Sequence, residues 1–276
     1  MRGKKHKYQL VPTVVLMISS VIMLFPFVWM VLSSFKTVAD VNAYPPRWIP
    51  SVWMPENYHT VLKRVPFARY YVNSIITAGG ATVLTVAIAL FAAYALSKLR
   101  FPGKRAVSIL FRACMFVPGI VLMIPQFFMF NRFGMSDTYA GIILPQVVSG
   151  FTILMLTVLI DDIPRDLMES AMIDGCGYYR CFANVIVPNC KTAILTATLH
   201  VFVGQWGSYL WPLMITTKTE MRTLMIGLKY LMSDNGAGLE YQIMMAAATM
   251  AVVPVFILYL CFEKQLVKST VMTGIK

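Results

Sequence analysis

Acidic side chains are concentrated in one short part of a sequence that otherwise carries few charges. On a helical wheel, residues 166 to 174 separate into two arcs. The polar arc holds Asp166, Glu169, Ser170 and Asp174, and the apolar arc holds Leu167, Met168, Ala171 and Met172. A short amphipathic helix of this kind is suited to bind in a groove of a partner. The chemistry that we predict here is therefore docking, and we call residues 161–191 the coupling loop.

The alternative for this helix is a position among lipid headgroups. Helices that lie on a membrane surface favour Lys and Arg on their polar face. The coupling loop instead carries five acids, Asp161, Asp162, Asp166, Glu169 and Asp174, against three bases, Arg165, Arg180 and Lys191. Repulsion between these acids and an anionic leaflet favours a protein partner.

Start and stop signals define the expected helices of the coupling loop. Pro164 after Asp161 and Asp162 predicts a helix start, since acids near a helix N-terminus interact favourably with the dipole. Gly175 and Gly177 are expected to end this helix with the positive φ of a tight reversal. A second short helix is expected from about Tyr178 to Val187, before Pro188.

The sequence offers no group for catalysis, metal binding or a cofactor. The five cysteines form no CxxC, and the three histidines, His6, His59 and His200, lack the spacing of a zinc site. No Ser-His-Asp arrangement is visible. The P-loop pattern GxxxxGK[ST] is also missing, because Gly3-Lys4 and Gly103-Lys104 are followed by Lys5 and Arg105. We therefore predict that the chain is not an enzyme and cannot itself hydrolyse ATP.

Composition places the chain in a membrane. Of its 276 residues 58% are apolar and 13% charged, and the mean hydropathy is +0.68, far from the values of soluble proteins. The net charge of +12 comes from Lys and Arg at the ends of apolar stretches, where anionic headgroups of the lipid bilayer account for it. Nucleic acid is therefore not an expected partner.

Six apolar stretches are long enough to cross a bilayer as helices. We expect an all-α, polytopic membrane bundle of six transmembrane helices in a single domain, 1–276, with an N-terminal helix at 10–35 that is a retained signal anchor and a five-helix core at about 70–262. Prolines in five spans predict kinks. The expected spans are Leu10–Phe35, Tyr70–Ser97, Ala106–Phe130, Tyr139–Ile160, Thr192–Thr217 and Tyr241–Phe262.

The distribution of basic residues sets the orientation. Six spans put both termini on one side. On the side of the termini Lys and Arg number 14, and on the other side they number 9, with the sharpest bias in the short segments MRGKKHK and KLRFPGKR. We expect both termini, and the coupling loop with them, in the cytoplasm of a prokaryotic cell whose inner membrane holds the chain.

The motif ESAMIDG, followed after nine residues by VIVP, closely resembles the EAA loop of permease subunits from ATP-binding-cassette (ABC) importers. Glu169, Ala171, Gly175 and Pro188 match that motif, and Ser170, Val185 and Val187 replace residues of similar size or apolarity. Further stretches, including AAYALSKLRFPGKR (92–105), VPGIVLMIPQF (117–127) and WGSYLWPL (206–213), resemble the carbohydrate branch of this family, of the maltose and multiple-sugar type.

The resemblance implies a coupling helix that docks in a groove of a cytoplasmic ATPase. Ala171 would let the helix seat closely, Gly175 would make the turn, and Glu169 would offer a carboxylate to the groove, with Ser170, Asp174 and Pro188 as further coupling residues. It also implies a second homologous permease, two ATPase subunits that bind the ATP, and an extracytoplasmic solute-binding protein. Outer loop 36–69, with Trp48, Trp53 and Tyr58, is either a surface for that protein or a set of interfacial anchors.

For the path of a carbohydrate substrate we select span five, where Gln205, Ser208 and Tyr209 offer hydrogen-bonding groups beside the ring of Trp206. Ser149 in span four is a further candidate, whereas Gly207 replaces a frequent asparagine of the family. A buried tryptophan can equally serve packing. The rival function is a secondary transporter or channel without ATP, which generally places several ionisable residues at mid-membrane. Here only His200 and Arg112 lie within spans.

Overall fold

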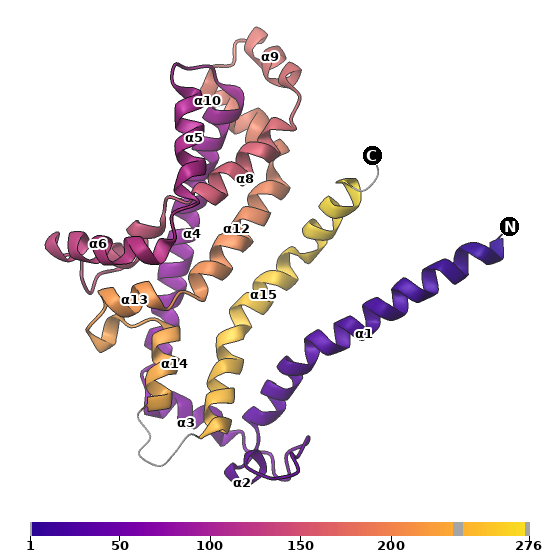
Figure 1. The fold of residues 1–276 in the computed structure, drawn as a ribbon, viewed down its shortest axis with the longest axis vertical. Helices are drawn as coiled ribbons and strands as arrows, with labels where there is room; N and C mark the ends of the chain where they lie inside the picture. Colours follow the sequence, from indigo (N-terminus) through magenta and orange to yellow (C-terminus); the bar gives the residue numbers. More distant parts are fainter. Residues whose placement is uncertain (1, 234–239, 274–276) are drawn as a thin grey trace. The chain divides into compact units, whose positions relative to one another are not determined.

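The computed structural model describes the backbone of residues 2–233 and 240–273, and it describes side chains for residues 10–232 and 240–263 (Figure 1). No strand occurs in these described ranges, so the predicted all-α class is confirmed. Three helices are each long and apolar enough to cross a membrane, over Leu10–Ser34, Phe67–Lys98 and Tyr241–Glu263. Three bent helix pairs raise the number to six if each pair is one span, which agrees with the predicted number. The third pair, Tyr178–Asn189 with Lys191–Trp206 at 79°, lies earlier in the chain than the predicted fifth span.

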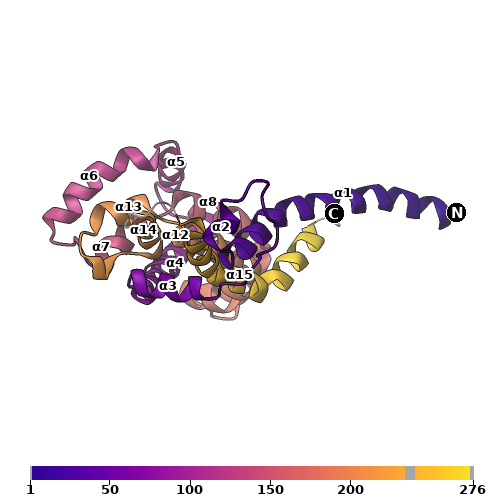
Figure 2. The ribbon, with the colours of Figure 1, turned by 90° about the horizontal axis from the view of Figure 1, so that it is seen from below.

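The bent pairs are where the observed helices differ from the expected spans. Helix α5 (Lys104–Cys114) and helix α6 (Gly119–Arg132) meet at 99°. Figures 1 and 2 show the change of direction between them. Pro118 lies at this break with an extended ψ of 126°, because a proline cannot donate a helical hydrogen bond. Helix α7 (Tyr139–Ile143) with η1 (Leu144–Gln146) meets α8 (Gly150–Asp161) at 51°.

The expected helix Thr192–Thr217 is also interrupted. Helix α12 (Lys191–Trp206) ends at Gly207, and α13 (Leu210–Ile215) follows as a separate short helix. Sixteen residues make about 24 Å of helix, less than the roughly 30 Å of a hydrocarbon core. By contrast, Pro26, Pro125 and Pro254 lie inside continuous helices.

The chain folds as two compact units. The first contains residues up to Phe67 together with 227–253, and the second contains residues 68–226 and those from Pro254 onward. In the first unit, α1 (Arg2–Ser34) is followed by α2 (Val38–Val41) and α3 (Glu56–Arg64). Helices α14 (Leu224–Ser233) and α15 (Tyr241–Thr273) contribute to both units.

Two buried charges organise the loop that follows α1. The Lys36 ammonium lies 3.7 Å from the centroid of the Trp29 ring and donates a hydrogen bond to Ser33. Burial lowers the pKa of Lys36, while the charge of Asp40 opposes that shift. The Asp40 carboxylate accepts hydrogen bonds from the backbone and the hydroxyl of Ser51 and from the guanidinium of Arg47. These contacts fix the loop between residues 36 and 51.

The loop around Asp40 is expected to loosen in acid. Hydrogen bonds from Ser51, followed by that from Arg47, lower the pKa of Asp40 to about 2, whereas an unfolded aspartate titrates near 3.9. Because the pKa of Asp40 is lower in the folded chain, the ionised carboxylate stabilises the fold fully above pH ~4. This stabilisation is lost as the pH falls through about 2 and the carboxylate is protonated. Pepsin should therefore cleave residues 37–54 faster in Asp40→Asn than in the native chain at pH 4, and the two rates should converge at pH 2. Equal rates at pH 4 would contradict this account.

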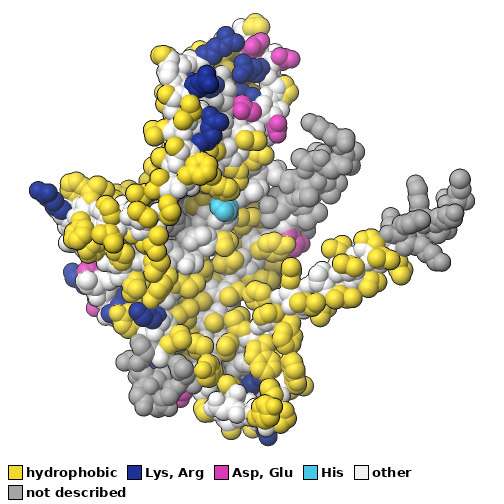
Figure 3. All heavy atoms as spheres, in the orientation of Figure 1, with side chains coloured by type: hydrophobic (Ala, Val, Ile, Leu, Met, Phe, Trp, Pro, Cys, Tyr) yellow, Lys and Arg dark blue, Asp and Glu magenta, His cyan; other side chains and the backbone are white. Residues whose placement is uncertain are grey.

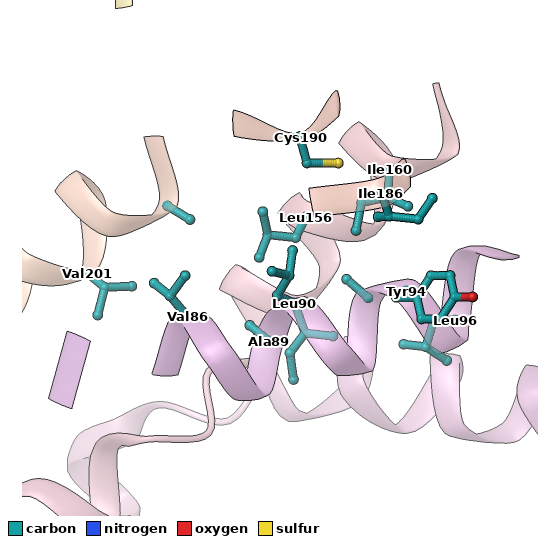
Figure 4. Close-up of a cluster of buried hydrophobic side chains, with 13 residues drawn as sticks. Val86, Ala89, Leu90, Tyr94, Leu96, Leu156, Ile160, Ile186, Cys190 and Val201 are labelled. Atoms are coloured by element: carbon teal, nitrogen blue, oxygen red, sulfur yellow. The ribbon is translucent and has the colours of Figure 1, made fainter. Parts of the chain in front are cut away.

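The core of the second unit is built on α4 (Phe67–Lys98). Buried side chains of α4 pack against α8, α12 and the segment before α12, and Figure 4 labels members of this core from each of these parts. Leu156 and Ile160 come from α8, Ile186 from the coupling loop and Val201 from α12. Helix α4 is thus the element that the other spans of this unit share.

Contacts at the two ends of α4 show which loops of the second unit lie at the same end of this helix. Near its start, the Asn73 amide donates to the carbonyls of Glu220 and Arg222. At its end, the Lys98 ammonium donates to the carbonyls of Asp161 and Ile163. The coupling loop therefore begins beside the KLRFPGKR loop, at the opposite end of α4 from residues 220–222, as expected when consecutive spans alternate in direction.

Candidate functional site

The expected docking helix is present as α9 (Arg165–Ile173), and Pro164 precedes it as predicted. Asp174 is its C-cap, and Gly175 follows with φ +84°. The Cys176 amide donates to the Ala171 carbonyl at 2.9 Å, and the Gly175 amide donates to the Met172 carbonyl at 3.0 Å. These two bonds define a Schellman motif, which needs a left-handed residue at position 175. The prediction for Gly175 is therefore confirmed.

Helix α9 presents a mixed face to solvent. Asp166, Glu169, Ser170 and Ile173 are exposed at i, i+3, i+4 and i+7 spacing, with Ile173 85% exposed. Met168, Ala171 and Met172 are half-buried on the other side, and Met168 packs against the core of the second unit. The small Ala171 thus lies on the side of α9 that faces its own chain, whereas Leu167, placed on the apolar arc by the sequence, is exposed.

Charged side chains gather around α9. Figure 3 shows Lys, Arg, Asp and Glu side chains together at this end of the second unit, with hydrophobic side chains covering the adjoining flank. Glu169 is exposed and accepts no hydrogen bond from another described residue. Its carboxylate is therefore available to a partner, as the docking hypothesis requires.

The second helix of the coupling loop differs from the prediction. Helix α10 (Tyr178–Cys181) continues through the π-helical turn η2 (Phe182–Ile186) into α11 (Val187–Asn189), so Pro188 does not end the helix. In η2 the Val187 amide donates to the Phe182 carbonyl, five residues earlier, as in a π-helix. This wider turn accommodates Pro188, which follows directly and has no amide hydrogen to donate. Gly177 has φ −71° and is the N-cap of α10, so its expected positive φ is wrong.

The residues selected for a substrate path are partly brought together. Gln205, Trp206 and Ser208 line one cavity of about 10 Å³ in the second unit, near the start of α4. That volume is about the minimum for one water molecule, so a sugar ring needs the surrounding helices to move apart. Tyr209 adjoins this group in sequence at the N-cap of α13, and it is half-buried.

Two of the selected residues have evident structural roles. Trp206 is 4% exposed, with Phe202 stacked at 5.7 Å and Tyr71 edge-on at 5.6 Å. Ser149 caps α8, because its hydroxyl oxygen accepts hydrogen bonds from the amide and the hydroxyl of Thr152. Ser149 does not line the cavity that contains Gln205.

Sequence reasoning missed four polar residues of this cavity, Ser74, Thr77, Gln146 and Thr223. Thr223 is 4% exposed, and its hydroxyl is the one buried side-chain polar atom without a hydrogen-bond partner among the described residues. Gln146 could have been found as an amide in an otherwise apolar span. Ser74 and Thr77 lie one turn apart on α4, but only the folded chain shows that they face span five.

The ionisable residues within the spans lie at the surface of the second unit. His200 is exposed on α12, with its ring 4.9 Å from that of Phe151. Arg112 is exposed on α5 and donates to the Ser108 carbonyl. Neither lines the polar cavity, so neither supplies the buried charge typical of an ion-coupled carrier.

The chain is similar to permeases over nearly its full length. It is 30% identical to the sulfoquinovosyl glycerol transport system permease protein SmoH of Agrobacterium fabrum, with 92% of this chain and 89% of the relative covered. It is 28% identical to the diacetylchitobiose uptake system permease protein NgcG of Streptomyces coelicolor, with 96% and 88% covered.

A solved structure has the same fold. It is a chain of a bacterial ABC transporter involved in the import of the acidic polysaccharide alginate. The TM-score is 0.82 at 24% sequence identity, and the match covers 96% of this chain and 98% of the other. A family model described as a binding-protein-dependent transport system inner membrane component matches residues 85–271, which include the coupling loop and all of the cavity's lining residues except Ser74 and Thr77. The chain therefore belongs to this family of inner membrane transport components.

Proposed function

We propose that the chain is one permease subunit of an ABC importer for carbohydrates. It forms half of the translocation path, a second homologous permease forms the other half, and two separate ATPase subunits bind and hydrolyse ATP. An extracytoplasmic binding protein delivers the substrate. The observation that carries this proposal is α9, whose Schellman turn and half-buried side leave a mixed face, with Asp166, Glu169 and Ile173 exposed, at one end of the second unit.

The coupling step follows from this geometry. ATP binding closes the ATPase dimer, and the grooves that hold the docked helices approach each other. Because α9 is packed on the second unit through Met168, its displacement moves the spans as rigid bodies and exchanges access between the two sides of the membrane. A charge-assisted hydrogen bond between Glu169 and a groove residue stabilises the docked state by about 1.5 to 3 kcal/mol.

A carbohydrate substrate is supported by the relatives, whose names refer to diacetylchitobiose and sulfoquinovosyl glycerol. The cavity with Gln205, Trp206 and Ser208 would then be a closed part of the path, and Thr223 would offer its unpaired hydroxyl to a sugar when the path opens. Tyr209 and Ser149 complete the proposed path residues. The sugar that the purified binding protein retains identifies the substrate directly.

In the proposed orientation both termini and α9 are cytoplasmic. The positive-inside rule supports it through the segment MRGKKHK, whose side chains lie outside the described part, and through KLRFPGKR, which lies beside the start of the coupling loop. Loop 36–69 is then extracytoplasmic. Trp48 and Trp53 are more than half exposed there, while Tyr58 is bonded to Ser34, so the two tryptophans are the proposed contacts for the binding protein.

Purification tests the proposed function. The tagged chain, solubilised in mild detergent, should bring an ATPase and a second permease with it. The copurified complex is reconstituted in proteoliposomes with ATP enclosed, and the binding protein with its retained sugar is added outside. Uptake of the sugar should then require the enclosed ATP. Transport by the chain in vesicles without ATP, and without any copurified ATPase, would establish the secondary-transporter alternative instead.

A further inference from the structure

Helix α4 contacts the coupling loop on both sides of α9. Before α9, the Ser97 hydroxyl donates to the Asp161 carboxylate at 2.5 Å, and the Lys98 ammonium donates to the carbonyls of Asp161 at 3.3 Å and Ile163 at 2.6 Å. After α9, the Tyr94 hydroxyl donates to the Tyr178 carbonyl at 3.1 Å. One helix therefore holds both flanks of the docking helix.

Aromatic packing strengthens the second of these attachments. Phe182 stacks on Phe91 of α4 with ring centroids 4.5 Å apart, and it lies against Tyr94 at 5.3 Å. Phe91, Tyr94 and Lys98 are spaced i, i+3 and i+7, so they form one strip along α4. The contacts to both flanks thus come from a single face of a continuous helix.

The Lys98 attachment is buried, and its shorter hydrogen bond is 2.6 Å long. Lys98 is 7% exposed, and a buried ammonium is destabilising unless acceptors surround it. The Asp161 carbonyl belongs to the last residue of α8, where carbonyls lack helical partners and the helix dipole favours a cation, and the Ile163 carbonyl lies two residues further on. Breaking this contact would leave both the ammonium and those carbonyls unsatisfied.

We propose that Lys98 and Tyr94 are positioning residues that join α9 and α4 into one rigid body, so that the ATPase moves α4 from both flanks of the coupling helix at once. This inference rests on the proposed function. Helix α4 runs unbroken from Lys98 to the turn with Ser74 and Thr77, which line the polar cavity. The strip formed by Phe91, Tyr94 and Lys98 is therefore the route by which α9 reaches the cavity.

Distance measurements between nitroxide labels test the rigid body. Labels are attached in Arg165→Cys, at the exposed start of α9, and in Val83→Cys, which is 69% exposed on α4, after the five native cysteines are replaced by serine. In the complex with its ATPase, the native distance distribution should be narrow and should stay unchanged when ATP and vanadate are added. In Tyr94→Phe/Lys98→Met the distance distribution should be broader without nucleotide. When ATP and vanadate are added, its mean should shift by about 2 Å, the scale of helix displacements in switching proteins.

Lys104→Met is the matched control. The Lys104 ammonium also donates to two carbonyls, those of Ser97 and Leu99, but these acceptors lie at the end of α4 and in the residue after it, not in the coupling loop. This variant should keep the native distribution in both states. If Lys98→Met lowers the yield of folded protein, Tyr94→Phe alone, which keeps the ring packing, should still broaden the distribution.

The outcomes separate this inference from the proposed function. A double variant with the native distribution in both states would overturn the rigid body, and so would a native distance that shifts with ATP and vanadate. A native chain that copurifies with no ATPase would refute the proposed function. Even then, the widths of the distance distributions of Tyr94→Phe/Lys98→Met and Lys104→Met, both measured without nucleotide, can be compared. A broader distribution in the double variant shows that Tyr94 and Lys98 fix α9 on α4, and equal widths show that they do not.

Discussion

Glu169→Lys is expected to reduce ATP-driven uptake by about 100-fold while the chain still folds and inserts. The carboxylate is exposed on α9 and has no hydrogen bond to another described residue, so the substitution disturbs nothing within the permease. Under the proposed function, it removes a charge-assisted contact of about 1.5 to 3 kcal/mol with the ATPase groove and places a cation where that groove would bind a carboxylate. Uptake into ATP-loaded proteoliposomes, per mole of permease, gives the measurement.

Two further variants show whether the effect is specific to the docking face. Glu169→Gln keeps the shape and one acceptor, and its uptake should fall by about tenfold, since a neutral hydrogen bond is roughly half as strong. Glu220→Lys makes the same change of charge at an exposed residue at the opposite end of α4 from the coupling loop, and it should transport nearly as well as the native chain. Native uptake by Glu169→Lys would remove the proposed role of α9.

Gly141→Ala is expected to destabilise the second unit by about 3 kcal/mol or more. An added Cβ would lie 2.0 Å from the Met135 carbonyl oxygen, and backbone there cannot move aside as a flexible side chain can. The turn is tied further by the Trp211 indole, which donates to the Gly141 carbonyl at 3.1 Å. Trp211 packs with Phe130 and Ile215, so the strain would spread into a hydrophobic cluster.

Thermal unfolding of the purified chain in detergent measures this loss. Gly79→Ala is the matched control, because Gly79 also lies in a helix of the second unit but has no atom within 4 Å of an added Cβ. It should unfold at the native temperature or slightly above, since alanine favours helix over glycine. A Gly141→Ala protein as stable as Gly79→Ala would show that the turn at residues 135–141 is not tightly packed.

Local signals in the sequence were sufficient to predict helix α9. The helical arcs and Pro164 predicted α9 to within a residue, and Gly175 was assigned the left-handed turn that it adopts. These predictions succeed because propensity, capping and periodicity act over a few neighbouring residues. Apolar length likewise predicted α1, α4 and the start of α15, where no interruption intervenes.

Predictions failed where distant contacts decide the structure. A run of apolar residues does not reveal that the chain turns by 99° between α5 and α6, because both helices remain apolar on either side of the turn. Pro188 was expected to end a helix, since a sequence does not show that a π turn before it can accommodate the ring. The polar cavity joins residues 74 to 223, and no local pattern connects them.

The π turn at Phe182–Ile186 also fixes the rotational setting of the residues that follow it up to Cys190, where the chain bends by 79° into α12. A π turn holds about one residue more than an α-helical turn, and each residue of an α-helix advances the side-chain direction by about 100°. Shortening this stretch by a single residue would regularise the helix and swing Ile186 and Cys190, both now buried in the core of the second unit, away from that core. Chain length between the docking helix and span five is therefore as constrained as residue type, and homologues should tolerate exchanges here far better than insertions or deletions.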